Sequence, residues 1–284
     1  MFSLVAKPFK FSYLYSKCKA LKSQTNDKDF FEILIDSNNY GDIYTYLQEK
    51  KYGNFIKEPT YESIHEGLNK YFVHLYKNIT KQLSQKERIL FELFFFGKET
   101  LLNDKQNIIH DKTIKTFNKL DIQFTKSLKK SLEHLNIENQ KDLSKIFGSY
   151  FDYMNLYTIF RLRVFYNAQT HEILPFLFPY GLRFKLKDMS MLLPLSSLNE
   201  FNSVLEPIYK IGFDDLSSFR RVLYNDHYRV LNSVWKGFPF KISIIFSLLR
   251  MKEIEIKNIK SIIEGVKYSQ SKQDIKRMIL GVNM

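Results

Sequence analysis

Glycine and proline are scarce in this chain. Its 284 residues include only 10 Gly and 7 Pro, whereas hydrophobic residues make up 44% and aromatic residues 16%. An all-β sandwich or barrel needs more turn residues than this, and a disordered chain carries far less apolar material. The composition therefore predicts a folded, all-α protein with long helices.

Cysteine and long apolar runs are scarce as well. The single Cys18 cannot form an internal disulfide, so nothing indicates an oxidising compartment. The longest apolar run without a charge covers residues 242–249, far fewer than the roughly 20 residues of a membrane-spanning helix. We expect no transmembrane segment and a soluble, cytoplasmic protein.

Arginine is scarce too, although the chain is basic. The formal net charge is +13, from 43 Lys+Arg against 30 Asp+Glu, and most of the cations are Lys. Nucleic-acid sites favour Arg because its planar guanidinium binds bases and phosphates in a bidentate way. The scarcity of Arg therefore weakens the interpretation of the chain as a Lys-rich helical nucleic-acid-binding protein. This interpretation stays an alternative, as does an unrelated helical scaffold.

Catalytic and metal-binding motifs are missing. The sequence holds no Gly-rich phosphate loop, no H-E-x-x-H and no nucleophile elbow, and one Cys cannot supply paired metal ligands. None of the six His has a His or Cys partner at the usual ligand spacing. The sequence predicts no catalytic residue, no metal ligand and no cofactor-binding residue.

Segments in the two halves of the chain match in the same order. Residues 42–48 match 200–206, and residues 89–94 match 244–249, with similar offsets. Their common order indicates related helical subdomains.

A third match lies within the second half of the chain. Segments 152–178 and 255–280 share acidic, amide and apolar positions, and the apolar residues recur at helical spacing. The corresponding positions are Asp152 with Glu255, Asn155 with Asn258, and 176–178 with 278–280.

A Lys-rich stretch covers residues 100–147 and has a weaker helical pattern. The spacing predicts a helix with one basic face, which is either a solvated surface or an interface for an anionic partner. The lysines of this face are Lys112, Lys115, Lys119, Lys126, Lys129 and Lys130.

The C-terminal part of the chain carries a recognisable pattern. Residues 252–262 read K-E-I-E-I-K-N-I-K-S-I, which resembles the K-E-x-E-I-x-N-L-x-x-I signature of the C subunit of V/A-type ATPases, the family that includes the d subunit of eukaryotic V-ATPases. Residues 152–161 resemble its internal D-x-x-N-L-x-x-x-x-R segment, with Arg161 or Arg163 in the basic place. The resemblance implies a structural or interface role for Asp152, Asn155, Arg161, Glu253, Glu255 and Asn258.

The same resemblance implies a funnel-like assembly of related helical subdomains around a pseudo-threefold axis. Residues 100–147 stand where the middle copy belongs but lack its D-x-x-N-L segment and Gly turns, so we expect this copy to be shortened or diverged. The expected parts are a first helical subdomain at 1–99, the middle helical segment at 100–147, a related subdomain at 148–253 and C-terminal helices at 254–284 that complete the repeat.

The function that the resemblance implies is that of a non-catalytic component of the central stalk. Such an adaptor links the shaft, made of the D and F subunits, to the membrane rotor ring and transmits torque for ATP-coupled H⁺ or Na⁺ transport. It lies on the cytoplasmic face of the membrane as a peripheral part of the complex. We expect part of the basic surface to meet acidic groups of these partners or anionic head groups.

Overall fold

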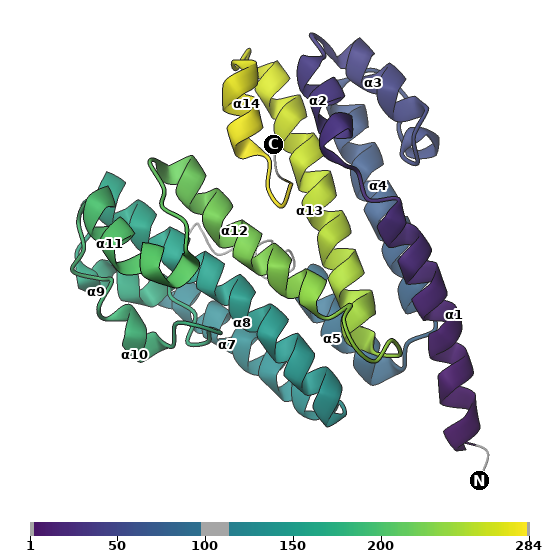
Figure 1. Cartoon of the computed structure of the whole chain (residues 1–284), viewed down its shortest axis with the longest axis horizontal. Helices are drawn as coiled ribbons and strands as arrows, with labels where there is room; N and C mark the ends of the chain where they lie inside the picture. The colour runs from purple at the N-terminus through teal and green to yellow at the C-terminus, as the bar shows by residue number, and fades with distance from the viewer. Residues whose placement is uncertain (1–2, 98–113, 283–284) are drawn as a thin grey trace. The chain divides into compact units, whose positions relative to one another are not determined.

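The computed structural model describes residues 3–97 and 114–282, with side chains from 11–97 and 123–282. These residues form helices joined by turns and loops, with no strand among them, so the predicted all-α fold is confirmed (Figure 1). The chain divides into two compact units, which are described separately. Unit 1 comprises 1–82, 235–240 and 244–284, and unit 2 comprises 83–234 and 241–243.

Unit 1 is built on the long helix α13 (Ile242–Lys267). Its buried residues include Ile256, Ile259 and Ile263, which recur at helical spacing as predicted. The other elements of the unit are α1 (Ser3–Ser23), α2 (Lys28–Asp36), α3 (Tyr40–Gln48), the 3₁₀ turn η1 (Gly53–Phe55), α4 (Tyr61–Thr80) and α14 (Lys272–Met278).

Polar contacts join helices of unit 1 that are far apart in the sequence. Lys260 Nζ on α13 donates to Asn69 Oδ1 on α4 at 2.6 Å. Lys272 Nζ on α14 lies 2.8 Å from Asp36 Oδ1 at the end of α2. The N-terminal and C-terminal parts of the chain therefore pack into one body.

Unit 2 contains the helices α8 (Ile137–Phe160) and α12 (Leu216–Ser233), which run side by side in Figure 1. Aromatic rings fill its core near the end of α8, where the ring centroid of Phe160 lies 5.1 Å from that of Phe201 and 4.5 Å from that of Phe219. The other elements of the unit are α5 (Gln85–Phe95), α7 (Ile114–Glu133), the π-helix η2 (Arg161–Phe165), α9 (Thr170–Ile173), the 3₁₀ turn η3 (Leu174–Phe176), α10 (Leu186–Met189) and α11 (Leu198–Tyr209).

Side-chain caps mark where several helices begin. Thr60 Oγ1 accepts the N–H of Ser63 at the start of α4, and Ser84 and Glu87 form a reciprocal capping box at the start of α5. Asn136 caps α8 through its side-chain oxygen. Each cap satisfies backbone N–H groups that a helix start leaves without an intrahelical partner.

The Lys-rich stretch is helical over the part that the structure describes. Helix α7 covers Ile114–Glu133, and Lys112 lies outside the described residues. The boundaries expected at 99/100, 147/148 and 253/254 separate segments that are related in sequence, whereas the two compact units are defined by packing. The division into related subdomains and the pseudo-threefold arrangement both stay predictions.

None of the helices in the described part of the chain is both long and apolar enough to cross a membrane.

Candidate functional site

Asn155 clamps a distant stretch of backbone to helix α8. Its side chain is fully buried; Oδ1 accepts the N–H of Phe178 at 2.8 Å, and Nδ2 donates to the carbonyl of the same residue at 2.9 Å. The two bonds together fix both the position and the orientation of Phe178. Because the Asn155 amide is buried away from water, it depends on the Phe178 backbone for its hydrogen bonds, and that backbone depends on Asn155.

Asn258 makes the same pair of bonds in unit 1. Its Oδ1 accepts the N–H of Leu280 at 3.0 Å, and its Nδ2 donates to the Leu280 carbonyl at 2.8 Å. Its side chain is also buried. The two segments that match in sequence therefore share one hydrogen-bond pattern, in which a helical Asn holds a backbone group 22 or 23 positions later.

A third clamp was not predicted from the sequence. Asn202 on α11 accepts the N–H of Phe213 at 3.0 Å and donates to its carbonyl at 2.6 Å. This Asn is half-buried and holds a residue only 11 positions later. It lies inside the matching segment 200–206, but that segment's counterpart has Tyr44 at the same place, so no shared Asn drew attention to it.

Asp152 holds the loop that follows the Asn155 clamp. Its carboxylate accepts three backbone N–H groups, from Leu182 at 3.2 Å, Arg183 at 2.7 Å and Phe184 at 3.2 Å. Burial raises the pKa of Asp152 to about 6, against the opposing effect of these hydrogen bonds. The carboxylate thus organises a nest of backbone donors deep in unit 2.

Gly181 lies in this loop at a point where the neighbouring backbone and the Asp152 carboxylate leave no room for a side chain. A Cβ on Gly181 would lie 2.1 Å from the Phe184 carbonyl oxygen and 2.3 Å from Asp152 Oδ1. Arg183, two residues on, binds the Asp226 carboxylate of α12 with both Nε (3.1 Å) and Nη2 (2.8 Å). The loop is therefore held between α8 and α12.

Glu255 has the corresponding place in α13, three residues before the clamping Asn. Its Oε2 accepts the N–H of Asn26 at 2.9 Å, and its Oε1 accepts the hydroxyl of Tyr52 at 2.5 Å. Lys51 and Lys252 lie 2.7 and 3.2 Å away. Burial raises the pKa of this carboxyl, but the two ammonium groups outweigh it and hold the pKa below its usual value. Glu255 therefore ties α13 to the N-terminal part of unit 1.

The other charged residues of the α13 signature also have partners nearby. Burial lowers the pKa of Lys252 to about 8, although the carboxylate of Glu255 favours its charged form. Glu253 lies between Arg250 (2.5 Å) and Lys257 (2.8 Å). Burial disfavours the charge of Glu253, and the two cations outweigh this and lower its pKa to about 2.

Arg161 and Arg163 are both candidates for the basic position of the signature segment that begins at Asp152, and the structure gives them different contacts. Arg161 is exposed, and its guanidinium donates to the Tyr166 hydroxyl at 3.3 Å. Arg163 binds three backbone carbonyls, those of Leu195 (3.1 Å), Ala168 (2.6 Å) and Pro194 (3.1 Å). Arg163 therefore joins chain segments, whereas Arg161 stays available at the surface beside an exposed aromatic ring.

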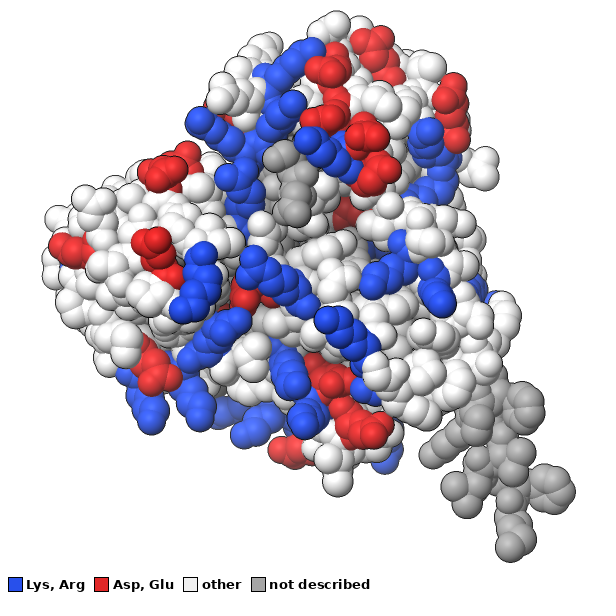
Figure 2. Space-filling view, in the orientation of Figure 1, with Lys and Arg blue, Asp and Glu red and all other residues white. Residues whose placement is uncertain are grey.

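The predicted basic face is exposed wherever its side chains are described. Lys126, Lys129 and Lys130 are exposed on α7, and Lys115 and Lys119 belong to the same helix without described side chains. On the face of unit 2 that Figure 2 shows, Lys and Arg side chains are also widespread, although the α7 lysines are not labelled there. The exposed lysines of α7 carry positive charge that an anionic group would complement.

The described side chains form no cluster of three or more His, Cys, Asp or Glu that could hold a metal ion. Cys18 is fully buried, and burial raises the pKa of its thiol to about 12, which disfavours the reactive thiolate. The arrangements found in both units are those of a structural framework: carboxylates and amides that bind backbone.

Comparison with known proteins identifies the family. The sequence model of the ATP synthase (C/AC39) subunit family matches residues 109–278, which is more than half of the chain. The chain belongs to this family. The matched range includes Asp152 with Asn155 and Glu255 with Asn258, on which the resemblance to the C subunit of V/A-type ATPases is based. The resemblance is therefore confirmed.

A curated relative supports the same assignment. The C subunit of the A-type ATP synthase of Methanococcoides burtonii is 28% identical to this chain over 159 residues. The match covers 52% of this chain and 43% of the relative. Less than half of that relative's length is therefore represented in the similarity.

Proposed function

We propose that this protein is a non-catalytic central-stalk adaptor of a rotary V/A-type ATPase. In this role it links the central shaft, made of the D and F subunits, to the membrane rotor ring and transmits torque for ATP-coupled H⁺ or Na⁺ transport. The observation that carries the proposal is the family match over residues 109–278. The protein would lie on the cytoplasmic face of the membrane as a peripheral part of the complex.

The internal construction of the two units supports a mechanical role. A body that transmits torque needs connecting segments that do not yield between its helices. Asn155 and Asn258 each hold a later stretch of backbone by a pair of buried hydrogen bonds, and Asp152 holds three further N–H groups. Buried, satisfied polar networks of this kind rigidify the structure around them.

The basic surface supports contact with acidic partners. Lys126, Lys129 and Lys130 project from α7, and the chain carries a net charge of +13. Opposite charge on the rotor loops, on the shaft or on lipid head groups would steer and orient the adaptor. Attraction of this kind weakens with salt, because exposed charges are screened over about 10 Å at 0.1 M.

Affinity purification tests the proposed assembly. The tagged chain is recovered from detergent-solubilised membranes of cells that produce it, and bound proteins are identified by mass spectrometry. We expect the D and F subunits and the ring proteolipid to be recovered together with the chain. Recovery of the intact chain without any other ATPase component, at low as well as moderate salt, would contradict the proposed role.

A charge variant tests the contribution of α7. Replacing Lys126 and Lys129 by Gln is expected to reduce recovery of the partners most at low salt, and its difference from the wild-type chain should shrink as salt is raised, because salt screens these charges. Lys141→Gln together with Lys145→Gln is a matched control, because these lysines are exposed on α8. Equal recovery with both variants would remove the basic face of α7 from the interface.

A further inference from the structure

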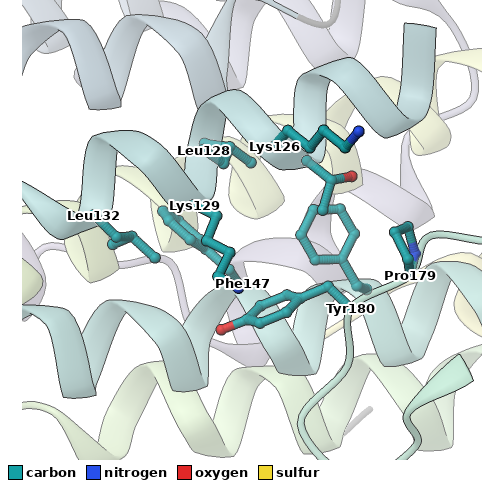
Figure 3. A pocket seen from close by; sticks show the side chains of 9 residues that line it. Lys126, Leu128, Lys129, Leu132, Phe147, Pro179 and Tyr180 are labelled. Carbon is teal, nitrogen blue, oxygen red and sulfur yellow. The ribbon is translucent and has the colours of Figure 1, made fainter. Parts of the chain in front are cut away.

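Unit 2 contains a small apolar cavity beside the basic face of α7. It has a volume of about 210 Å³. Figure 3 shows Lys126 and Lys129 on the α7 side and Pro179 and Tyr180 on the side of the loop that follows Phe178. We call it the Lys126 cavity; its lining residues are Thr125, Lys126, Leu128, Lys129, Leu132, Phe147, Phe151, Pro179 and Tyr180.

The size of the Lys126 cavity fits one large side chain. Pockets for whole small-molecule ligands are usually about 300–1,000 Å³, whereas an apolar cavity of about 150 Å³ holds a single benzene ring. At about 210 Å³, with Leu128, Leu132, Phe147 and Phe151 buried in its wall, the cavity matches one aromatic or branched aliphatic group. An anchor residue of a bound peptide has these dimensions.

The rim of the Lys126 cavity is basic. Lys126 and Lys129 are exposed, and within the described part of the chain neither forms an ion pair with an acidic side chain. Lys130 follows on the same helix and is also exposed. Carboxylates beside the anchor residue would complement these charges, whereas a basic or neutral segment would gain nothing from them.

The loop wall of the Lys126 cavity is fixed by the signature residues. Pro179 and Tyr180 directly follow Phe178, whose backbone N–H and carbonyl are both bound by the Asn155 side chain. Two residues after Tyr180, the backbone is held by Asp152, and the Tyr180 hydroxyl itself donates to the Ser144 carbonyl at 3.2 Å. The cavity is therefore preformed, which lowers the ordering cost of binding.

We propose that the Lys126 cavity binds an acidic peptide segment of a partner protein, with one bulky apolar side chain in the cavity and neighbouring carboxylates at Lys126 and Lys129. The inference does not depend on the proposed function, because it rests only on the size, lining and charge of the cavity. It assigns to Asp152 and Asn155 a positioning role for the cavity wall.

A designed peptide tests this binding directly on the full chain. The probe is a fluorescein-labelled peptide with one phenylalanine between two runs of three glutamates, and its binding is followed by fluorescence anisotropy. Replacing its phenylalanine by serine is expected to weaken binding about tenfold or more, because the buried ring is lost. Replacing its glutamates by glutamine is expected to weaken binding and to remove most of the salt dependence.

Two protein variants locate the site. Lys126→Gln combined with Lys129→Gln is expected to weaken binding of the probe about fivefold to tenfold, as loss of two charge contacts. Lys141→Gln combined with Lys145→Gln removes the same charge from α8 and is expected to change binding less than about twofold. Circular dichroism melting is the check on folding, and each variant is expected to melt like the wild-type chain, since all four side chains are exposed.

Three results would overturn the proposal. The first is that the probe does not bind the wild-type chain at low salt, or binds no better than its serine version. The second is that both double variants bind it equally. The third is that free phenylacetate displaces it at an equal concentration, which would assign the cavity to small amphipathic anions instead of a peptide.

Discussion

Replacing Asn155 by Ala removes both partners of the Phe178 peptide groups at once. A buried donor or acceptor that loses its partner costs roughly 1–3 kcal/mol. Two such groups, which pair with a side chain that is fully buried, predict a loss of about 2–6 kcal/mol in the free energy of unfolding. Water entering the vacated space would bring the loss toward the lower end of this range.

The same substitution at Asn258 is expected to cost a similar amount, because its two bonds to Leu280 have nearly the same lengths. Urea unfolding followed by far-ultraviolet circular dichroism measures both variants. Unit 1 also has its own probe, since the single Trp235 lies there and donates to Ser247 Oγ at 3.0 Å. Tryptophan fluorescence should therefore report the Asn258→Ala variant directly.

Asn199 provides the matched control for Asn155. It is exposed on α11 in the same unit, so Asn199→Ala is expected to change the free energy of unfolding by less than about 0.5 kcal/mol. If Asn155→Ala is no more destabilising than Asn199→Ala, the clamp does not hold the loop and the reasoning is refuted.

Three further predictions concern the loop and the buried groups. Gly181→Ala should lower the free energy of unfolding by more than about 2 kcal/mol, because the new Cβ would collide with backbone. In Gly212→Ala the new Cβ makes only ordinary contacts, so this control should cost under about 0.5 kcal/mol. Denaturant titration measures both variants. The pKa of Asp152 is raised to about 6 in the folded chain, so with rising pH the unfolded chain loses this proton at a lower pH than the folded chain does. The free energy of unfolding should therefore fall by roughly 3 kcal/mol as the pH rises from about 4 to above 6. This part of the pH profile should vanish in Asp152→Asn. Cys18 should resist iodoacetamide at pH 8 until the chain is unfolded, and complete labelling within minutes in native buffer would contradict its burial.

Much of the fold could be predicted from local features of the sequence. The scarcity of Gly and Pro and the spacing of residues such as Ile256, Ile259 and Ile263 indicate helices, because helix formation depends on near neighbours. The correspondence of Asn155 with Asn258 was also visible, since both follow an acidic residue at the same spacing.

The partners of these residues could not be predicted. Glu255 binds Asn26 and Tyr52, more than 200 positions away, and no local pattern announces such contacts. Spacing could not decide between Arg161 and Arg163, because only packing places one of them among three carbonyls. The Lys126 cavity likewise arises from α7, α8 and a loop that meet only in the folded unit.

Ion transport in membrane vesicles tests the central claim most directly. Vesicles are prepared from cells that lack this chain, and ATP-driven H⁺ and Na⁺ uptake is measured before and after purified chain is added back. The adaptor role predicts ATP hydrolysis without ion uptake in the depleted vesicles, and uptake restored by the wild-type chain. Ion uptake of normal rate in vesicles shown to lack the chain would contradict it.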